Sequence, residues 1–360
     1  MKQDLLSGVW AAPTRQPTFS PREWELILGQ ARQARLQGRL AQHFAERDWL
    51  KDVPSGPRCH LESGLVIARR QWHEVRWEAD CIRRALAKVD TPVVMLKGAA
   101  YLLAGLPAAR GRIFSDIDIL VEPSKLTDVE SALFAAGWIS EERDAYNDRY
   151  YRQWMHELPP LRHVQRGTSI DVHHTITPPT SRFKVDGAKL LTRIQAIPGH
   201  PGLYTLSPVD MVLHSAAHLF LEGEFGHGLR DLLDMNDLMI HFSESADFWD
   251  ELLDRSVQLG LQIPLSHALI HLKRLFSTSP PVPLEARATS LDRSVLTRRL
   301  MSNLLELALR PDHPSCDGRF TGLARWMLYV RAHHLRMPMH LVVPHLTRKA
   351  LMRMWSEDTE

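Results

Sequence analysis

The sequence has 360 residues, of which 44% are hydrophobic and 24% are charged, so it is long enough for two or three subdomains with hydrophobic cores. A formal net charge of +2 gives no overall attraction for nucleic acid and leaves room only for local basic clusters. The three cysteines lack the spacing of a metal or redox motif, which argues against a disulfide framework. No apolar run reaches the about 18 residues of a membrane span, so we expect a soluble, cytoplasmic protein.

The first 88 residues are expected to form helices. Apolar residues recur at helical spacing in residues 21–50, and the Pro- and Gly-containing stretch DVPSGPRC interrupts this pattern. Residues 60–89 then predict one long amphipathic helix. We therefore divide the chain into an N-terminal helical region (1–88), a sheet-containing core (89–200) and a C-terminal helical domain (201–360).

The core begins with residues 93–96 (VVML), which predict a buried strand followed by a turn at Lys97 and Gly98 and a helix from Ala99. Gly98 permits close backbone approach, the first amides of a helix attract anions, and Lys97 adds a positive charge. Arg112 stands four residues before Asp116, close enough to pair with it or to reach a phosphate. The alternative for Lys97 is a solvated lysine at a strand end.

Residues 115–121 (SDIDILV) predict a strand with Asp116 and Asp118 on one face and branched aliphatic residues on the other. Two neighbouring acids repel each other, and Asp is disfavoured in strands, so folding alone gives little reason for this pattern. Binding of a hard divalent cation such as Mg²⁺ would explain the pattern, because such ions take carboxylate oxygens as ligands. The alternative is a strand end with two solvated acids.

A third acid follows in the next predicted hairpin. Residues 161–165 and 169–174 read as two antiparallel strands joined by a short turn. Asp171 points with His173 to the face opposite Ile170 and Val172. Two carboxylates from one strand and a third from a neighbouring strand form a recurring two-metal arrangement for phosphoryl chemistry.

The C-terminal half is predicted to be helical. Ser207 and Pro208 start its first helix, with the hydroxyl as N-cap and the proline at the first helical position. Further helices are expected near residues 228–241, 247–260, 263–276, 292–309, 319–335 and 345–355.

Four polar residues of these helices allow more than one reading. His214 and His218 have the i, i+4 spacing of a zinc pair, but packed or hydrogen-bonded histidines are favoured because no third ligand is evident. Arg230 is expected to pair with Asp234, four residues later, with Asp231 as an extra acid. A substrate contact by Arg230 or Asp231 is the less favoured alternative.

Three of these segments together carry a resemblance: VVMLKGAAYLLAG, the stretch from Arg112 through DIDILV, and SIDVHH. They resemble the nucleotidyltransferase superfamily of DNA polymerase β type, and more closely its poorly characterised bacterial branch. The likeness covers residues 90–175 well and continues more loosely through SPVDMVLHSAAHLF and LRDLLDMNDLMIH. The resemblance implies an α/β (α+β) fold with a mixed β-sheet flanked by helices. It also implies that Asp116, Asp118 and Asp171 bind Mg²⁺ and that the protein transfers a nucleotidyl group from an NTP.

The chain departs from classical members at one place. Lys97–Gly98–Ala99 stands where those members have Gly-Gly/Ser, whose hydroxyl and amides hold the triphosphate, and Lys97 offers charge in place of the missing hydroxyl. We therefore predict nucleotide binding by Lys97, Gly98, Arg112 and His173. Catalysis and metal binding are assigned to Asp116, Asp118 and Asp171, with two Mg²⁺ ions expected and Mn²⁺ as an alternative.

The leading functional hypothesis is an enzyme in which an acceptor hydroxyl attacks the α-phosphorus of an NTP and pyrophosphate leaves. The acceptor is left open among a peptide, a sugar, another small molecule and an RNA end, with nucleic acid not favoured and no membrane partner expected. A DxD-type glycosyl or sugar-nucleotide transferase is an alternative, but it needs alternating strands and helices before the acids. A non-catalytic nucleotide-binding module is the second alternative.

Overall fold

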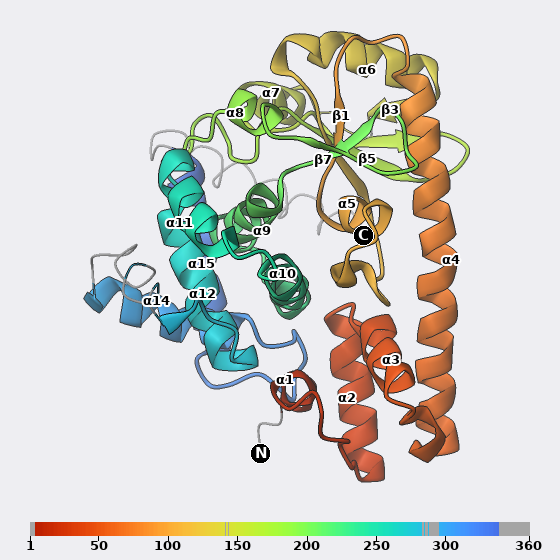
Figure 1. The fold of residues 1–360 in the computed structure, drawn as a ribbon, viewed down its shortest axis with the longest axis vertical. Coiled ribbons are helices and arrows are strands. Elements are labelled where there is room, and N and C mark those ends of the chain that lie inside the picture. Colours follow the sequence, from red (N-terminus) through yellow and green to blue (C-terminus); the bar gives the residue numbers. More distant parts are fainter. Residues whose placement is uncertain are drawn as a thin grey trace, which may run out of the picture.

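The N-terminal residues form helices, as expected. The computed structural model describes residues 4–140, 142, 144–282, 284, 287 and 295–337 (Figure 1). Helix α2 starts with a capping box, in which Ser20 and Glu23 exchange side-chain and backbone hydrogen bonds. The elements of this region are α1 (Leu5–Ala11), α2 (Pro21–Gln33), α3 (Gln37–Glu46), η1 (Leu50–Asp52) and α4 (Ser55–Ala85). The 31-residue α4 runs along one edge of the molecule, from α2 and α3 to the sheet (Figure 1).

A seven-stranded mixed sheet follows, with the order β3-β4-β5-β2-β1-β7-β6. Two neighbouring pairs, β2 with β5 and β1 with β7, are parallel, and the other four pairs are antiparallel. The strands are β1 (Val93–Met95), β2 (Ile117–Leu120), β3 (Trp138–Ser140), β4 (Leu161–His163), β5 (Ser169–His173), β6 (Gln195–Ala196) and β7 (Leu203–Thr205). The predicted mixed sheet flanked by helices is confirmed, including the antiparallel hairpin of β4 and β5.

Short helices connect and cover the strands. Figure 1 shows α6 over one side of the sheet and α5 below β1. Helix α5 begins at Lys97, two residues before the predicted start at Ala99. The connecting helices are α5 (Lys97–Leu103), η2 (Pro107–Ala109), η3 (Pro123–Lys125), α6 (Leu126–Ala135), α7 (Ala145–Trp154) and α8 (Gly187–Leu191).

The C-terminal helices begin where the sequence predicts, with Ser207 accepting the Asp210 backbone N–H and Pro208 in the first turn of α9. They are α9 (Pro208–Glu222), α10 (Gly228–Phe242), α11 (Phe248–Leu259), α12 (Gln262–Phe276), α14 (Val295–Ala308) and α15 (Thr321–Arg336). The helix predicted near 345–355 lies outside the described residues. Within the part of the chain that is described, no helix has both the length and the apolar character to cross a bilayer.

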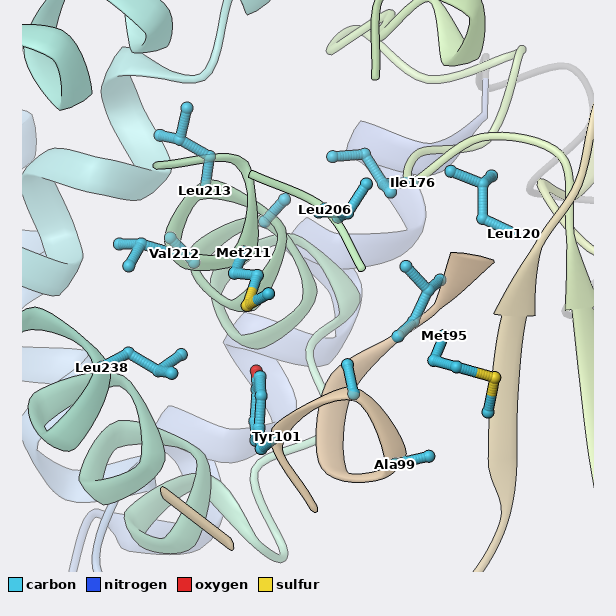
Figure 2. Packing of buried hydrophobic residues seen from close by; sticks show 14 of the residues in the cluster. Met95, Ala99, Tyr101, Leu120, Ile176, Leu206, Met211, Val212, Leu213 and Leu238 are labelled. Atoms are coloured by element: carbon cyan, nitrogen blue, oxygen red, sulfur yellow. The ribbon is translucent and has the colours of Figure 1, made fainter. Parts of the chain in front are cut away.

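One hydrophobic cluster joins the sheet to the C-terminal helices. It runs from Val75 on α4 through the strands to Leu328 on α15. Figure 2 shows part of this cluster, where Tyr101 of α5 lies below Met211 of α9 and Met95 of β1 extends toward the neighbouring strand. The cluster therefore crosses residue 200, and the predicted division of the chain at that point stays a prediction. A second cluster packs the N-terminal helices against Leu229 and Leu233 of α10.

Candidate active site

The parallel pairing of β2 and β5 places two carboxylates side by side. Asp118 of β2 is the register partner of Asp171 of β5, so both side chains leave the same face of the sheet. Asp118 is buried and Asp171 is partly buried. Asp116 lies just before β2, is exposed, and accepts a 2.8 Å hydrogen bond from the Ser115 hydroxyl. The strand pairing thus brings the acids of two separate sequence motifs to one place.

Lys97 is held beside Asp118 by the backbone. The Leu96 N–H donates a 2.9 Å hydrogen bond to the carbonyl of Asp118 across the antiparallel β1–β2 pair. Lys97 then takes a left-handed conformation with φ of 45°, which is unfavourable for a residue with a Cβ and is typical of functional positions. Its Nζ donates to Asp118 Oδ1 over 2.8 Å. The alternative of a solvated strand-end lysine is therefore wrong.

Burial, together with the carboxylates of Asp118 and Glu157, raises the pKa of Asp171 to about 7. Burial acts on Asp118 in the same direction, but Lys97 and His173 outweigh it and hold the pKa of Asp118 well below its usual range. The His173 Nε2 lies 3.1 Å from Asp118 Oδ1. The pKa of Asp118 is thus lowered and that of its neighbour Asp171 is raised. This pattern is typical of a site with one permanent anion and one group that can exchange a proton near neutral pH.

Several side chains around these aspartates were missed by the sequence analysis. Glu157 Oε2 lies 3.4 Å from His173 Nδ1, because residues 156–158 run antiparallel to the end of β5. Glu222 lies at the end of α9. Of the carboxylates that raise the pKa of Lys97, Glu222 has the second-largest effect, after Asp118. Its Oε2 lies 2.6 Å from His218 Nδ1. The His218–Glu222 pair has i, i+4 spacing and could have been found from the sequence. Glu157 had no such local signal.

Helix α9 also brings His214 to this region. Burial and then the charge of Lys97 lower the pKa of His214 well below its usual value. His214 is buried, in line with the favoured packed histidines, and His218 Nδ1 lies 2.6 Å from Glu222 Oε2.

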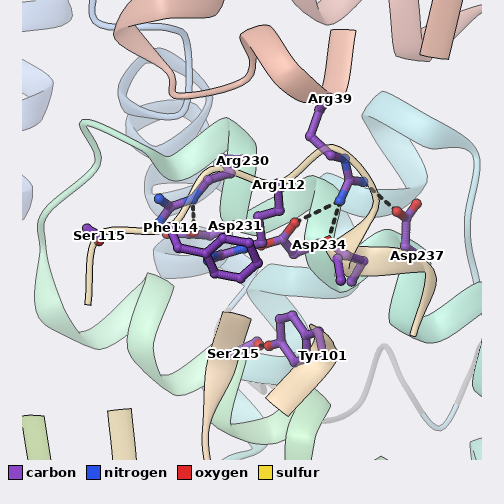
Figure 3. Close-up of polar contacts among 12 residues, drawn as sticks. Arg39, Tyr101, Arg112, Phe114, Ser115, Ser215, Arg230, Asp231, Asp234 and Asp237 are labelled. Atoms are coloured by element: carbon purple, nitrogen blue, oxygen red, sulfur yellow. Dashed lines mark hydrogen bonds and ion pairs between the residues drawn. The ribbon is translucent and has the colours of Figure 1, made fainter. Parts of the chain in front are cut away.

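Arg112 occupies a different place from the one expected. Its Nε donates to Asp234 Oδ2 of α10 over 2.7 Å, and the side chain is buried, so the expected pairing with Asp116 is wrong (Figure 3). A Cβ on Gly98 would lie 2.2 Å from Arg112 Nη1. The close approach predicted at Gly98 therefore serves the guanidinium of Arg112. Nucleotide binding by Arg112 and Gly98 stays a prediction.

Asp234 is the centre of a buried ion network (Figure 3). Besides Arg112, it accepts a 3.1 Å bond from Arg39 of α3, which also binds Asp237 and the carbonyl of Ala108. Arg230 pairs at 2.7 Å with its neighbour Asp231. The predicted Arg230–Asp234 pair is therefore wrong, because two arginines from other segments bind Asp234.

The ligand chemistry of the three aspartates suits a hard divalent cation, although their oxygens do not form one group within 4.8 Å among the described residues. They offer carboxylate oxygens, the ligands that Mg²⁺ prefers. Their mutual repulsion contributes to the raised pKa of Asp171, and a cation between them would remove it. A cavity of about 100 Å³ lies between α4 and the starts of β2 and β5. Asp116 lines it together with Glu78 and Thr168, whereas Asp118 and Asp171 are not part of its lining.

The fold and these acids define a protein of the nucleotidyltransferase class. Residues 20–277, from the N-cap of α2 to the C-cap of α12, match the family described as uncharacterised nucleotidyltransferase, and the chain belongs to this family. The resemblance seen in the sequence is thereby confirmed, and with it a general role in nucleotidyl transfer and a nucleotide substrate. No curated protein and no solved structure matches the chain.

We expect Asp234→Asn to lower the free energy of unfolding by about 3–5 kcal/mol, because it leaves the buried guanidinium of Arg112 without its anion and Arg39 with Asp237 alone. Asp48→Asn is the matched control. It removes an exposed carboxylate paired with Lys51 and should cost no more than about 1 kcal/mol. Urea denaturation of both variants measures the difference, and equal losses would contradict a structural role for the network.

Proposed function

We propose that the chain is a metal-dependent nucleotidyltransferase that moves a nucleotidyl group from an NTP to an acceptor hydroxyl on a small molecule or peptide. The observation that carries this proposal is the register of β2 and β5, which sets Asp118 beside Asp171 with Asp116 at the start of β2. The acceptor oxygen forms a bond to the α-phosphorus, and the bond from that phosphorus to the bridging oxygen breaks. Pyrophosphate is the leaving group.

The three aspartates would hold the metal, with two Mg²⁺ ions expected and Mn²⁺ as an alternative. When bound, such ions lower the pKa of the acceptor hydroxyl and neutralise charge on the triphosphate and on the pyrophosphate. Membership of a nucleotidyltransferase family and the oxygen-only donor set of Asp116, Asp118 and Asp171 support this assignment.

Asp171 is the group that we assign to proton transfer. Its carboxylate stands beside Asp118 through the pairing of β2 with β5, where it can accept the proton of the acceptor hydroxyl. Asp118 stays ionised because Lys97 and His173 both contact its Oδ1. His173 is thus assigned to orienting Asp118, and because it is buried this role replaces the predicted contact with the nucleotide.

Lys97 is assigned to the triphosphate. Its side chain is 19% exposed and its ammonium group is held at the aspartates, so one face of it can meet an incoming phosphate. Charge-assisted contacts of this kind replace the hydroxyl that the Lys97–Gly98–Ala99 turn lacks.

A DxD-type glycosyl or sugar-nucleotide transferase is not favoured. Its nucleotide-binding unit needs several alternating strands and helices ahead of the acids. Among the described residues, β1 is the only strand that precedes β2, and the other elements of that region are helices. A non-catalytic nucleotide-binding module is not favoured, because all three acids of the motif are present.

Asp118→Asn should abolish metal-dependent NTP turnover, because it removes the carboxylate that β2 and β5 place next to Asp171. Pyrophosphate release from each NTP, with and without Mg²⁺, measures this across a panel of peptide, sugar and other hydroxyl acceptors. Asp128→Asn, a change on α6 away from these strands, should leave turnover unchanged. Near-normal turnover in Asp118→Asn would overturn the metal-site assignment.

Asp171→Asn should separate chemistry from binding. A group that accepts a proton in the transition state affects the rate more than it affects ground-state affinity. We expect this variant to bind Mg²⁺-NTP within about tenfold of the wild type and to transfer at least ~100-fold more slowly. Calorimetry gives the affinity and single-turnover kinetics the rate. Equal losses in both would make Asp171 a metal ligand only.

Lys97→Ala should lower nucleotide affinity roughly 10–100-fold, the value of one lost hydrogen bond to a charged group. Lys88→Ala is the control, since Lys88 is exposed and lies before β1. Calorimetric titration with a non-hydrolysable NTP analogue gives both affinities. Unchanged affinity in Lys97→Ala would show that this lysine pairs with Asp118 but does not bind the nucleotide.

A further inference from the structure

A second group of metal-binding side chains lies next to the three aspartates. It consists of His156 and Glu157, which precede β4, and His173 at the end of β5. One ligand atom from each of these residues lies within 4.8 Å of the other two. Glu222 of α9 adds a carboxylate, with Oε1 3.8 Å from His156 Nε2. Three separate segments thus contribute to one cluster.

The spacing of these atoms fits a tetrahedral metal site. Bonds of about 2.0–2.1 Å from a central ion place neighbouring ligand atoms about 3.4 Å apart. His173 Nδ1 lies 3.4 Å from Glu157 Oε2, and His156 Nε2 lies 3.9 Å from the same oxygen. The third pair of ligand atoms, from His156 and His173, lies within 4.8 Å, so side-chain movements of about 1 Å would bring all three to bonding distance of one ion.

An unpartnered nitrogen points into the cluster. His173 is 1% exposed, and its Nδ1 makes no hydrogen bond. Its other nitrogen, Nε2, lies 3.1 Å from Asp118 Oδ1. Metal-binding histidines have this arrangement, because the ring nitrogen that does not bind the metal donates to a carboxylate and fixes the tautomer.

We propose that His156, Glu157 and His173 bind one divalent transition-metal ion such as Zn²⁺, with Glu222 as the nearest candidate for a fourth ligand. Two imidazole nitrogens and a carboxylate suit Zn²⁺ and related ions, whereas Mg²⁺ prefers oxygen ligands alone. The site is therefore chemically distinct from the three aspartates. It does not rest on the proposed catalysis, because it concerns metal content and not turnover.

A metal at this place would have a structural effect on the aspartates. It would fix the tautomer of His173, so that Nε2–H donates to Asp118. It would also hold residues 156–158 against β5 and, through Glu222, against α9. Asp118 would then be oriented by Lys97 on one side and by a metal-anchored histidine on the other.

The test is the Zn²⁺ content and affinity of the full chain. Elemental analysis after dialysis against excess Mg²⁺ should give one Zn²⁺ per chain, and Co²⁺ added to the chelator-treated protein should give the visible absorption of a tetrahedral site. His156→Gln and His173→Gln should each lower Zn²⁺ affinity at least ~100-fold, and Asp118→Asn should lower it roughly 10–100-fold as an outer-shell partner.

His174→Gln is the matched control, because His174 follows His173 and contacts the carbonyl of Met155. Its Zn²⁺ affinity should equal that of the wild type. If a histidine variant fails to fold by circular dichroism, Glu157→Gln takes its place with the same expected loss. Absence of bound Zn²⁺ in the wild type, its displacement by Mg²⁺, or equal affinity in all folded variants would each overturn the proposal, whatever the result for NTP turnover.

Discussion

The arrangement of the site depends on the parallel pairing of β2 with β5, which sets Asp118 and Asp171 side by side. Two neighbouring carboxylates repel each other, and partial burial strengthens the repulsion. The structure keeps Asp118 ionised by means of Lys97 and His173 and leaves Asp171 with a pKa of about 7. Lys97 and His173 thus reduce the repulsion between Asp118 and Asp171, and a bound cation would remove the remainder.

The position of Lys97, which neutralises Asp118, depends in turn on residues outside the site. Lys97 lies in a strained left-handed conformation, and Gly98 next to it leaves the space that the Arg112 guanidinium fills. Arg112 is bound by Asp234, which Arg39 of α3 also binds. A buried ion network of this kind adds little net stability, but breaking it is costly. Its location suggests that it sets the path of the chain between β1 and β2, which is the segment that delivers Asp116 and Asp118.

Sequence periodicity predicted the local part of this arrangement. Alternation in SDIDILV and SIDVHH placed Asp118, Asp171 and His173 on one face of their strands, and the sheet confirms it. It did not predict the partners of Arg112 and Arg230, because Asp234 receives its arginines from α3 and from the β1–β2 connection. Glu157 escaped notice for the same reason. Its segment joins the end of β5 through backbone pairing, and this contact has no period in the sequence.

The hydrogen bond between His173 and Asp118 connects two groups of candidate metal ligands that differ in chemistry. On one side are the oxygens of the three aspartates, which suit a hard ion that exchanges with the nucleotide. On the other are two imidazoles and Glu157, which suit a borderline ion that stays bound. Because β5 carries both Asp171 and His173, any shift of this strand moves both sets together. Anchoring His173 would therefore also limit how far Asp171 can move from Asp118, and the geometry of the aspartates would depend on a group outside them.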